Sequence, residues 1–128
     1  MEKIVVKQIE QIEAYSGPHA IPGIRFRPAR EALGVSAWGM SVIELDPGCS
    51  GYPTHDHADD GHEEVYVVLK GSIVLVVDGD ERTLHEGALV RVGPDASRKF
   101  VTRESGATLL VIGGTPGRPY APSRGRKR

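Results

Sequence analysis

Cysteine and long apolar runs are scarce in this chain of 128 residues, and each scarcity excludes a class of protein. The single cysteine, Cys49, cannot form an intramolecular disulfide, which excludes a fold held together by disulfides. No apolar run exceeds five residues, the length of the run at 73–77, whereas a membrane-spanning helix needs about 20. The N-terminus also lacks the basic start and apolar stretch of a secretory signal. We therefore expect a cytoplasmic protein with no membrane partner.

Length and charge indicate a single domain followed by a short basic tail. Apolar residues make up 39% of the chain and charged residues 26%, as in soluble proteins with one core. We expect one domain over residues 1–117, with an N-terminal arm at 1–22 and a core at 23–117. Residues 118–128 hold five basic residues and no acidic one, which predicts a flexible, solubilising tail. Nucleic-acid binding by this tail is the less favoured alternative, because no basic groove with interleaved aromatics accompanies it.

Alternating and β-branched segments predict an all-β fold. Residues 23–27 alternate arginines with apolar residues, and residues 64–71 and 72–79 are dense in valine. Further strand-like segments lie at 35–46 and in a series between residues 81 and 114. Sixteen glycines and nine prolines separate these short segments, a pattern typical of a sandwich or a small barrel.

Local patterns predict how the segments are connected. Gly71 and the serine after it separate two predicted strands. Asp78-Gly79 predicts a two-residue hairpin, because a type I′ turn needs positive φ at both central positions. The segment PAREAL, residues 28–33, predicts the only helical turn, with a proline at its start.

The N-terminal arm carries an alternation of its own. Ile4 and Val6 share one side of an extended chain, which predicts an edge strand or a segment that covers a partner subunit. We therefore expect a homodimer that forms through strand edges and this arm.

The segment THDHADDGHEEVYVVLKG, residues 54–71, combines histidines and acidic residues at the start of a predicted strand. His55 and His57 lie two residues apart, so both imidazoles project to one side of an extended chain. Glu64 begins the strand that follows. Two imidazoles and one carboxylate on one side of a pocket form a ligand set with open positions, which suits zinc, manganese, iron or nickel. The alternative is a polar loop that caps a barrel and binds no ion.

These residues resemble the first motif of the cupins, which are small double-stranded β-helix (jelly-roll) barrels. The segment PGCSGYPTHDH is followed by EEVYVVLKG, in which six residues separate Glu64 from Gly71 as in the family. The second cupin motif resembles GALVRVGPDASRKF, residues 87–100, and the resemblance covers about residues 35–115. It implies a divalent metal in the barrel mouth and oxygenase or isomerase chemistry on a small chelating acid. One such fold hosts many activities, so this implication rests on analogy.

The chain departs from the family pattern at the fourth metal ligand. The second motif normally supplies a histidine, but by register that position is Arg98, with Lys99 the less favoured alternative, and no histidine follows His85. A guanidinium stays protonated and offers no lone pair to a metal. His62 is the best substitute, because it lies two residues before Glu64 and faces the same side if the strand begins early. If the register slips by one residue, Glu63 replaces Glu64 and His62 turns away.

Arginines and aromatic residues are the candidates for binding a substrate. By analogy Arg98 points into the barrel mouth, where a guanidinium can hold a carboxylate or a phosphate. Arg25 is a further candidate, although a position facing solvent or a partner subunit is favoured for it. We expect Tyr66 and Trp38 to line the interior of the barrel as core or pocket wall.

Two functions therefore follow from the sequence. The first is a metal-binding protein that acts on a small anionic or chelating molecule through His55, His57 and Glu64, with His62 auxiliary. The second is a metal-free module that binds or senses a small molecule, in which Arg98 recognises an anion.

Overall fold

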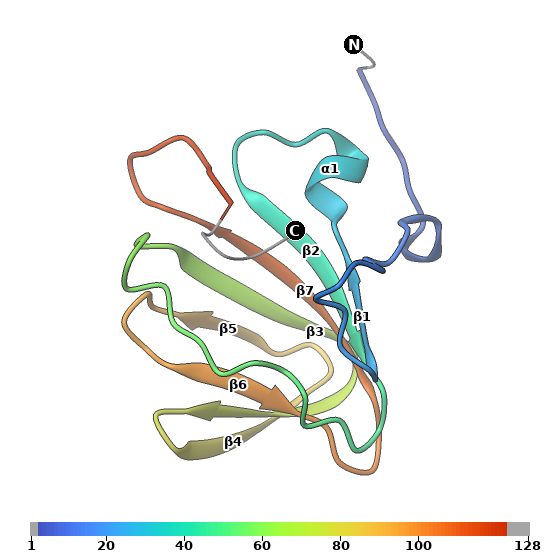
Figure 1. Ribbon diagram of the computed structural model, residues 1–128, viewed down its shortest axis with the longest axis vertical. Helices are drawn as coiled ribbons and strands as arrows, with labels where there is room; N and C mark the ends of the chain where they lie inside the picture. The colour runs from blue at the N-terminus through green and yellow to red at the C-terminus, as the bar shows by residue number, and fades with distance from the viewer. Residues whose placement is uncertain (1–2, 123–128) are drawn as a thin grey trace.

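The computed structural model describes residues 3–122, and strands dominate it (Figure 1). In chain order the elements are the 3-10 turn η1 (Ile9–Gln11), β1 (Ile24–Arg27), α1 (Ala29–Leu33), β2 (Gly39–Leu45), β3 (Glu63–Val77), β4 (Asp80–His85), β5 (Leu89–Val92), β6 (Arg98–Val101) and β7 (Ala107–Gly114). The predicted all-β fold and the helical turn predicted at 28–33 are confirmed, although η1 adds a further 3-10 turn that was not predicted. Across residues 3–122, no helix has the length and the apolar character needed to cross a membrane.

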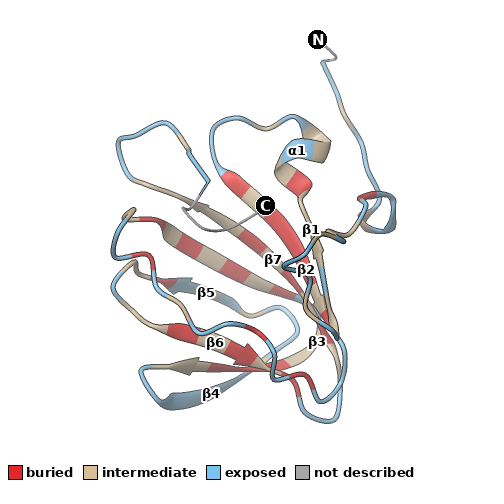
Figure 2. Cartoon of the chain, in the orientation of Figure 1, coloured by how far each residue is buried: buried red, intermediate tan, exposed pale blue. Residues whose placement is uncertain are grey.

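Strand β3 belongs to two groups of strands and joins them. Its first half pairs with β7 and β5, and its second half, from Ser72, pairs with β4 and β6. Strands β1 and β2 extend the first group in the order β1-β2-β7-β3. Buried and partly exposed residues alternate over the first six residues of β3, Glu63–Val68, as Figure 2 shows. One apolar core fills the space inside, and its members come from both groups: Ile43, Leu45, Tyr66, Val68, Ile73, Leu75, Phe100 and Leu109.

The prediction of two separate strands at 64–71 and 72–79 is wrong, because β3 runs through Gly71 without a break. The strand bends there instead, with a register shift between Val68 and Lys70. Gly71 has a φ of 77°, and a Cβ at this position would lie 2.0 Å from the carbonyl oxygen of Gly106. Glycine therefore allows β3 to pass closely over β7 as the strand moves from one group to the other.

The hairpin predicted at Asp78-Gly79 is confirmed. Both residues have positive φ, 49° and 88°, and the turn joins β3 to β4 through the pair Val77 and Asp80. The sequence signal is reliable here because only a few residue types tolerate both central positions of such a turn.

The N-terminal arm forms no strand between residues 3 and 23, so the predicted β arm is wrong. It contains only η1, after which Ile12 is buried against Ala29 and Val42. The stretch before η1 leads away from the barrel, and Ile4 and Val6 are 77% and 78% exposed (Figure 1). Alternation alone did not make a strand, because this segment pairs with no neighbouring strand. The homodimer stays a prediction.

Arg25 lies on an outer surface of the barrel and not in its interior. Its guanidinium binds Glu44 at 3.0 Å and Asp46 at 2.9 Å. Arg27 binds the same Glu44 oxygen at 2.8 Å. The arginines of β1 thus form ion pairs with acidic residues on and just after the adjacent strand β2. These ion pairs hold the guanidinium of Arg25 on a surface away from the candidate site.

Replacing Gly71 tests the bend in β3. Gly71→Ala should lower the free energy of unfolding by about 2–4 kcal/mol, because the new Cβ meets backbone and the φ is unfavourable. Chemical denaturation measures this. Gly114→Ala is the matched control, since a Cβ there meets nothing within 4 Å. Equal stability of both variants would contradict this account of the bend.

The Glu44 cluster predicts a dependence of stability on pH. Burial by itself raises the pKa of Glu44, but the hydrogen bonds and charges of Arg27 and Arg25 outweigh it and hold the pKa below the ordinary 4.5. The stabilisation is therefore complete above pH 4.5 and is lost as the pH falls through the lower pKa of the folded state. Glu44→Gln should cost about 0.5–1 kcal/mol near neutral pH and flatten this acid limb, measured by denaturation at several pH values. An unchanged acid limb would contradict the assignment.

Candidate metal centre

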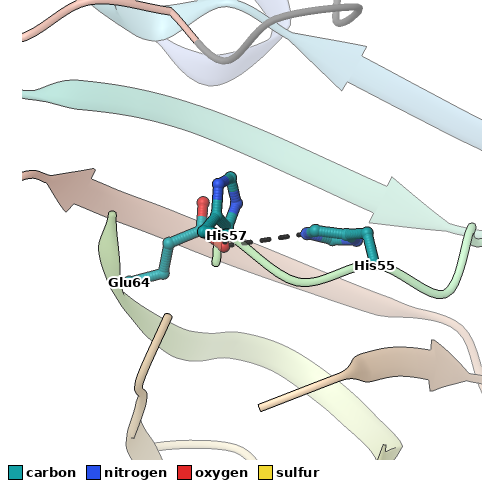
Figure 3. Close-up of side chains that lie close together, drawn as sticks. All are labelled: His55, His57 and Glu64. Carbon is teal, nitrogen blue, oxygen red and sulfur yellow. Dashed lines mark ion pairs between the residues drawn. The ribbon is translucent and has the colours of Figure 1, made fainter. Parts of the chain in front are cut away.

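The three side chains singled out from the sequence converge in the structure. The Nε2 atom of His57 lies 3.3 Å from Oε1 of Glu64, and Nε2 of His55 lies 3.9 Å from the same oxygen. One potential ligand atom from each residue lies within 4.8 Å of the other two. Figure 3 shows the three side chains pointing toward one another. The expectation that both imidazoles face one side of the chain is met.

Backbone pairing holds the histidine segment in place. His55 and Arg98 form an isolated antiparallel bridge. The backbone nitrogen of His55 lies 3.0 Å from the carbonyl oxygen of Arg98, and the backbone nitrogen of Arg98 lies 2.9 Å from the carbonyl oxygen of His55. The N–H of His57 donates to the carbonyl of Pro94 at 2.8 Å. Glu64 lies near the start of β3, opposite Val92 on β5. The site is thus assembled from a loop, β3 and the approach to β6, which lie far apart in the sequence.

The Nδ1 atom of each imidazole has a partner that orients the ring. Nδ1 of His55 lies 3.1 Å from the carbonyl oxygen of Pro53, which can only accept, so this nitrogen carries the proton. Nδ1 of His57 donates to the carboxylate of Asp60 at 3.1 Å. The Nε2 lone pair of His55 then faces the centre, where Nε2 is buried and has no hydrogen-bond partner among the described residues. An imidazole ligand with Nδ1 held in this way is the usual arrangement around a metal, and the residues present fit one.

Glu64 is buried and is held by two neighbours. The hydroxyl of Tyr66 donates to its Oε1 at 2.5 Å, and the guanidinium of Arg98 donates to the same oxygen at 3.1 Å. Arg98 also donates to Tyr66 at 3.3 Å and to the carbonyl of Ala96 at 2.8 Å. Arg98 is 0% exposed. Its guanidinium is therefore committed to positioning Glu64 inside the barrel and offers no open face to a substrate.

The same contacts shift two pKa values. Burial by itself lowers the pKa of His57, but the hydrogen bond and charge of Glu64, and then those of Asp60, hold it above the ordinary 6.5. Burial also raises the pKa of Tyr66 well above 10.0, so its hydroxyl keeps the proton that it donates to Glu64. A metal ion at Nε2 of His57 must therefore compete with a proton, and binding should weaken as the pH falls.

His62 is buried beside the site but is not the fourth member of it. Its ring stacks on His57 with centroids 5.2 Å apart, and its Nδ1 lies 3.8 Å from Asp60. His57, Asp60 and His62 form a second group of potential ligand atoms, which shares His57 with the group that contains Glu64. Glu63 points outward and binds Arg91, so the alternative register with Glu63 in the site is excluded.

The structure places the two aromatic residues predicted to line the barrel, Tyr66 and Trp38, in different environments. Tyr66 lies in the core and touches Glu64, as its predicted interior position requires. Trp38 is 46% exposed just before β2, so its predicted place inside the barrel is wrong. Met40 and Val42, which share the side of Trp38 on an extended chain, pack with Ile12 and Ala29 and not with the interior core, so Trp38 lies on the outer side as well.

Sequence reasoning missed two residues near the centre. Asp60 orients His57, and the only signal for it is its position three residues after His57 in a loop. Tyr120 lies in the segment predicted to be a flexible tail, but its ring lies 5.4 Å from that of His62. The described part of that segment, up to residue 122, therefore includes a side chain that packs on the barrel. The rest of the predicted tail lies outside the described residues.

A shallow hollow of about 190 Å³, with open solvent included, lies beside the site. Its lining residues are Gly39, His62, Glu64, Val111, Gly113 and Tyr120. A Cβ at Gly113 would lie 3.0 Å from Cγ of Glu64, so glycine permits the close packing here. The hollow has no enclosed space for a small molecule as it stands, so a ligand would reach Glu64 only if a lining side chain such as Tyr120 moved.

Comparison with known proteins gives one family. A family model described as a cupin domain matches residues 41–113, from within β2 to within β7. A search of curated proteins gives no match. A sugar phosphate isomerase of the cupin superfamily from Silicibacter pomeroyi has a similar structure, with a TM-score of 0.69 and 26% identity over 83% of this chain and 73% of that one.

Two further solved structures agree on the fold. A cupin protein from Bacteroides fragilis has a TM-score of 0.68 at 20% identity and covers 100% of this chain and 99% of its own. A predicted oxalate decarboxylase from Thermotoga maritima has a TM-score of 0.68 at 19% identity, over 85% of this chain and 97% of that chain. The predicted jelly-roll fold and the family resemblance are confirmed.

Removing Arg98 tests its role as the partner of Glu64. Arg98→Gln should lower the free energy of unfolding by about 3–5 kcal/mol, because it leaves a buried carboxylate without its counter-charge. Glu64→Gln/Arg98→Gln should lose less than the sum of the single variants, with a coupling of about 1–3 kcal/mol in a double-mutant cycle. Chemical denaturation measures all four proteins. Strictly additive losses would show that the two side chains do not depend on each other.

Proposed function

The chain belongs to the cupin domain family, and from this premise we propose that its barrel mouth binds a divalent transition metal through His55, His57 and Glu64. The buried Nε2 of His55, which faces Glu64 without a hydrogen-bond partner among residues 3–122, is the observation that carries the proposal. Two imidazole nitrogens and one carboxylate suit zinc, manganese, iron or nickel.

Each residue around the three ligands has a defined task. Pro53 and Asp60 orient the imidazoles, while Arg98 and Tyr66 fix the carboxylate of Glu64. When bound, the ion supplies a Lewis acid that polarises an oxygen atom of a substrate. Three protein ligands leave positions open for such an oxygen.

The charges of the site favour an anionic molecule. Arg98 offsets the charge of Glu64, so Asp60 alone remains to balance a divalent ion. One positive charge is then uncompensated in a buried environment, where electrostatic interactions are stronger than in water. We infer a small ligand that combines oxygen donors for the ion with an anionic group.

Isomerisation is the reaction class that we propose for such a ligand. The similar protein from Silicibacter pomeroyi, which is 26% identical to this chain, is a sugar phosphate isomerase. Moving a proton between carbons needs a group that gives and takes protons. His62 lies in the wall of the hollow beside Glu64 and is placed for this task.

A metal-free binding module is the second candidate, and the Arg98–Glu64 pair favours it. The carboxylate already has its counter-charge at 3.1 Å, so the mouth needs no ion for neutrality. The anion receptor that the sequence suggested for this module is Arg98. Its complete burial argues against that role, so a module of this kind would have to recognise its ligand elsewhere.

Metal analysis tests the two candidates. The protein purified without a histidine tag should carry close to one divalent ion per chain, measured by elemental mass spectrometry. His55→Ala should carry only traces, because it removes a ligand whose Nδ1 is already positioned. His85→Ala is the matched control, since this imidazole is exposed on β4 and should leave the metal content unchanged.

The same samples show how the proposal would fail. Equal trace metal in the parent and in His55→Ala, after both are offered zinc, manganese, iron and nickel in turn, would end the metal proposal. The second candidate would then be the one to follow.

A further inference from the structure

Arg30, on α1, has an unusual set of neighbours for a partly buried arginine. Its Nε is buried and has no hydrogen-bond partner among residues 3–122. Nor does its guanidinium form an ion pair with a carboxylate of the described chain. Five other arginines each pair with a glutamate: Arg25, Arg27, Arg91, Arg98 and Arg103. A buried N–H group without an acceptor, such as the Nε of Arg30, costs free energy unless a ligand supplies the acceptor.

Tyr120 connects Arg30 to the metal centre. The guanidinium carbon of Arg30 lies 4.8 Å above the ring of Tyr120. The same ring lies 5.4 Å from that of His62, which in turn stacks on His57 at 5.2 Å. A continuous row of side chains thus runs from α1 to the metal centre.

The close approach of Tyr120 depends on a glycine. A Cβ at Gly39 would lie 2.6 Å from Cε1 of Tyr120, so a larger residue at the start of β2 would push the ring away. Glycine at this position is thus part of what lets the ring reach His62.

Two hollows meet at Tyr120. One is the hollow that reaches Glu64 and His62. The other, of about 300 Å³ with open solvent included, is lined by Phe26, Pro28, Arg30, Glu31, Met40, Tyr120 and Pro122. Neither hollow has enclosed space for more than about one water molecule, so a small molecule that reaches from Arg30 to Glu64 would displace the ring of Tyr120.

We propose that Arg30 is the anion-recognition residue of this protein, and that it binds the phosphate or carboxylate end of a small molecule whose oxygen-rich end reaches the metal centre. The bridging part of this inference rests on the proposed function, whereas the anion site rests on Arg30 itself. A guanidinium offers two parallel N–H groups to such an anion, and the ring of Tyr120 holds its plane. This role is the one that the sequence assigned to Arg98.

Glu31 provides the matched control for this site. Its exposed carboxylate lines the same hollow, so it repels the anion that Arg30 attracts. Arg30→Gln should weaken binding of an anionic probe by about tenfold or more, the loss expected for a charge-assisted contact. Glu31→Gln should leave this binding unchanged or tighten it. Arg30→Lys keeps the charge without the paired donors and should lie between the parent and Arg30→Gln.

The experiment measures binding by calorimetry to metal-loaded protein, with ribose 5-phosphate, gluconate and neutral ribose as probes. The parent should bind one or both anionic probes more tightly than ribose, and comparison of the two distinguishes phosphate from carboxylate recognition. The advantage over ribose should disappear in Arg30→Gln, while the metal content and melting temperature of this variant stay at the parent's values. If Arg30→Gln proves unstable, Arg30→Lys replaces it, and the advantage over ribose should then be reduced but not abolished.

A second arm separates this inference from the metal proposal. In chelator-treated protein, inorganic phosphate or acetate should raise the melting temperature of the parent and of Glu31→Gln, but not that of Arg30→Gln. That result would support the anion site even if the protein bound no metal. Anionic probes that bind the parent no better than ribose, or that bind Arg30→Gln as well as the parent, would overturn the inference. So would the absence of an Arg30-dependent response to inorganic phosphate and acetate.

Discussion

The carboxylate of Glu64 and the guanidinium of Arg98 form a buried ion pair, and the candidate site is arranged around it. Tyr66 donates to the same carboxylate oxygen, and both histidine Nε2 atoms face it. A buried charge is tolerable only when it is paired and hydrogen-bonded. The barrel therefore closes around a polar cluster whose members must all be present at once, which fixes where each side chain points. A loop histidine could not reach this point reproducibly without such a framework.

The fold supplies that framework through backbone pairing. Glu64 and Tyr66 lie two residues apart on β3, so both point into the barrel, while the bridge between His55 and Arg98 brings the loop to β6. The bend at Gly71 lets β3 pair with β7 on one side of it and with β6 on the other. A local backbone requirement at one glycine thus decides whether the ligands on β3 and the arginine on β6 can meet.

Replacement of a fourth ligand by arginine changes the chemistry expected of the mouth. A histidine at position 98 would add a neutral donor, whereas Arg98 adds a positive charge and occupies one oxygen of Glu64. Such a site favours an anionic ligand over a further protein ligand. The buried Nε of Arg30, which has no acceptor among the described residues, is joined to the site through Tyr120. Under the proposal made above, positioning of the carboxylate by Arg98 and recognition of the ligand by Arg30 are two separate tasks.

Patterns that depend on neighbours in the chain were readable from the sequence. They include the strands, the turn at Asp78-Gly79 and the shared side of His55 and His57, because each follows from backbone periodicity or from one residue's allowed φ. Three features depended on residues more than 30 positions away in the chain. They are the continuation of the strand past Gly71, the hydrogen bond of Arg98 to Tyr66, and the ring that lies beside His62. Alternation in the N-terminal arm shows that a segment can be a strand, but not that a partner strand lies beside it. Alternation around Trp38 shows which residues share a face, but not which face of β2 is the interior one. The sequence by itself determines local backbone conformation, because this depends on neighbouring residues. Burial of side chains and pairing of strands are decided only when distant segments pack together.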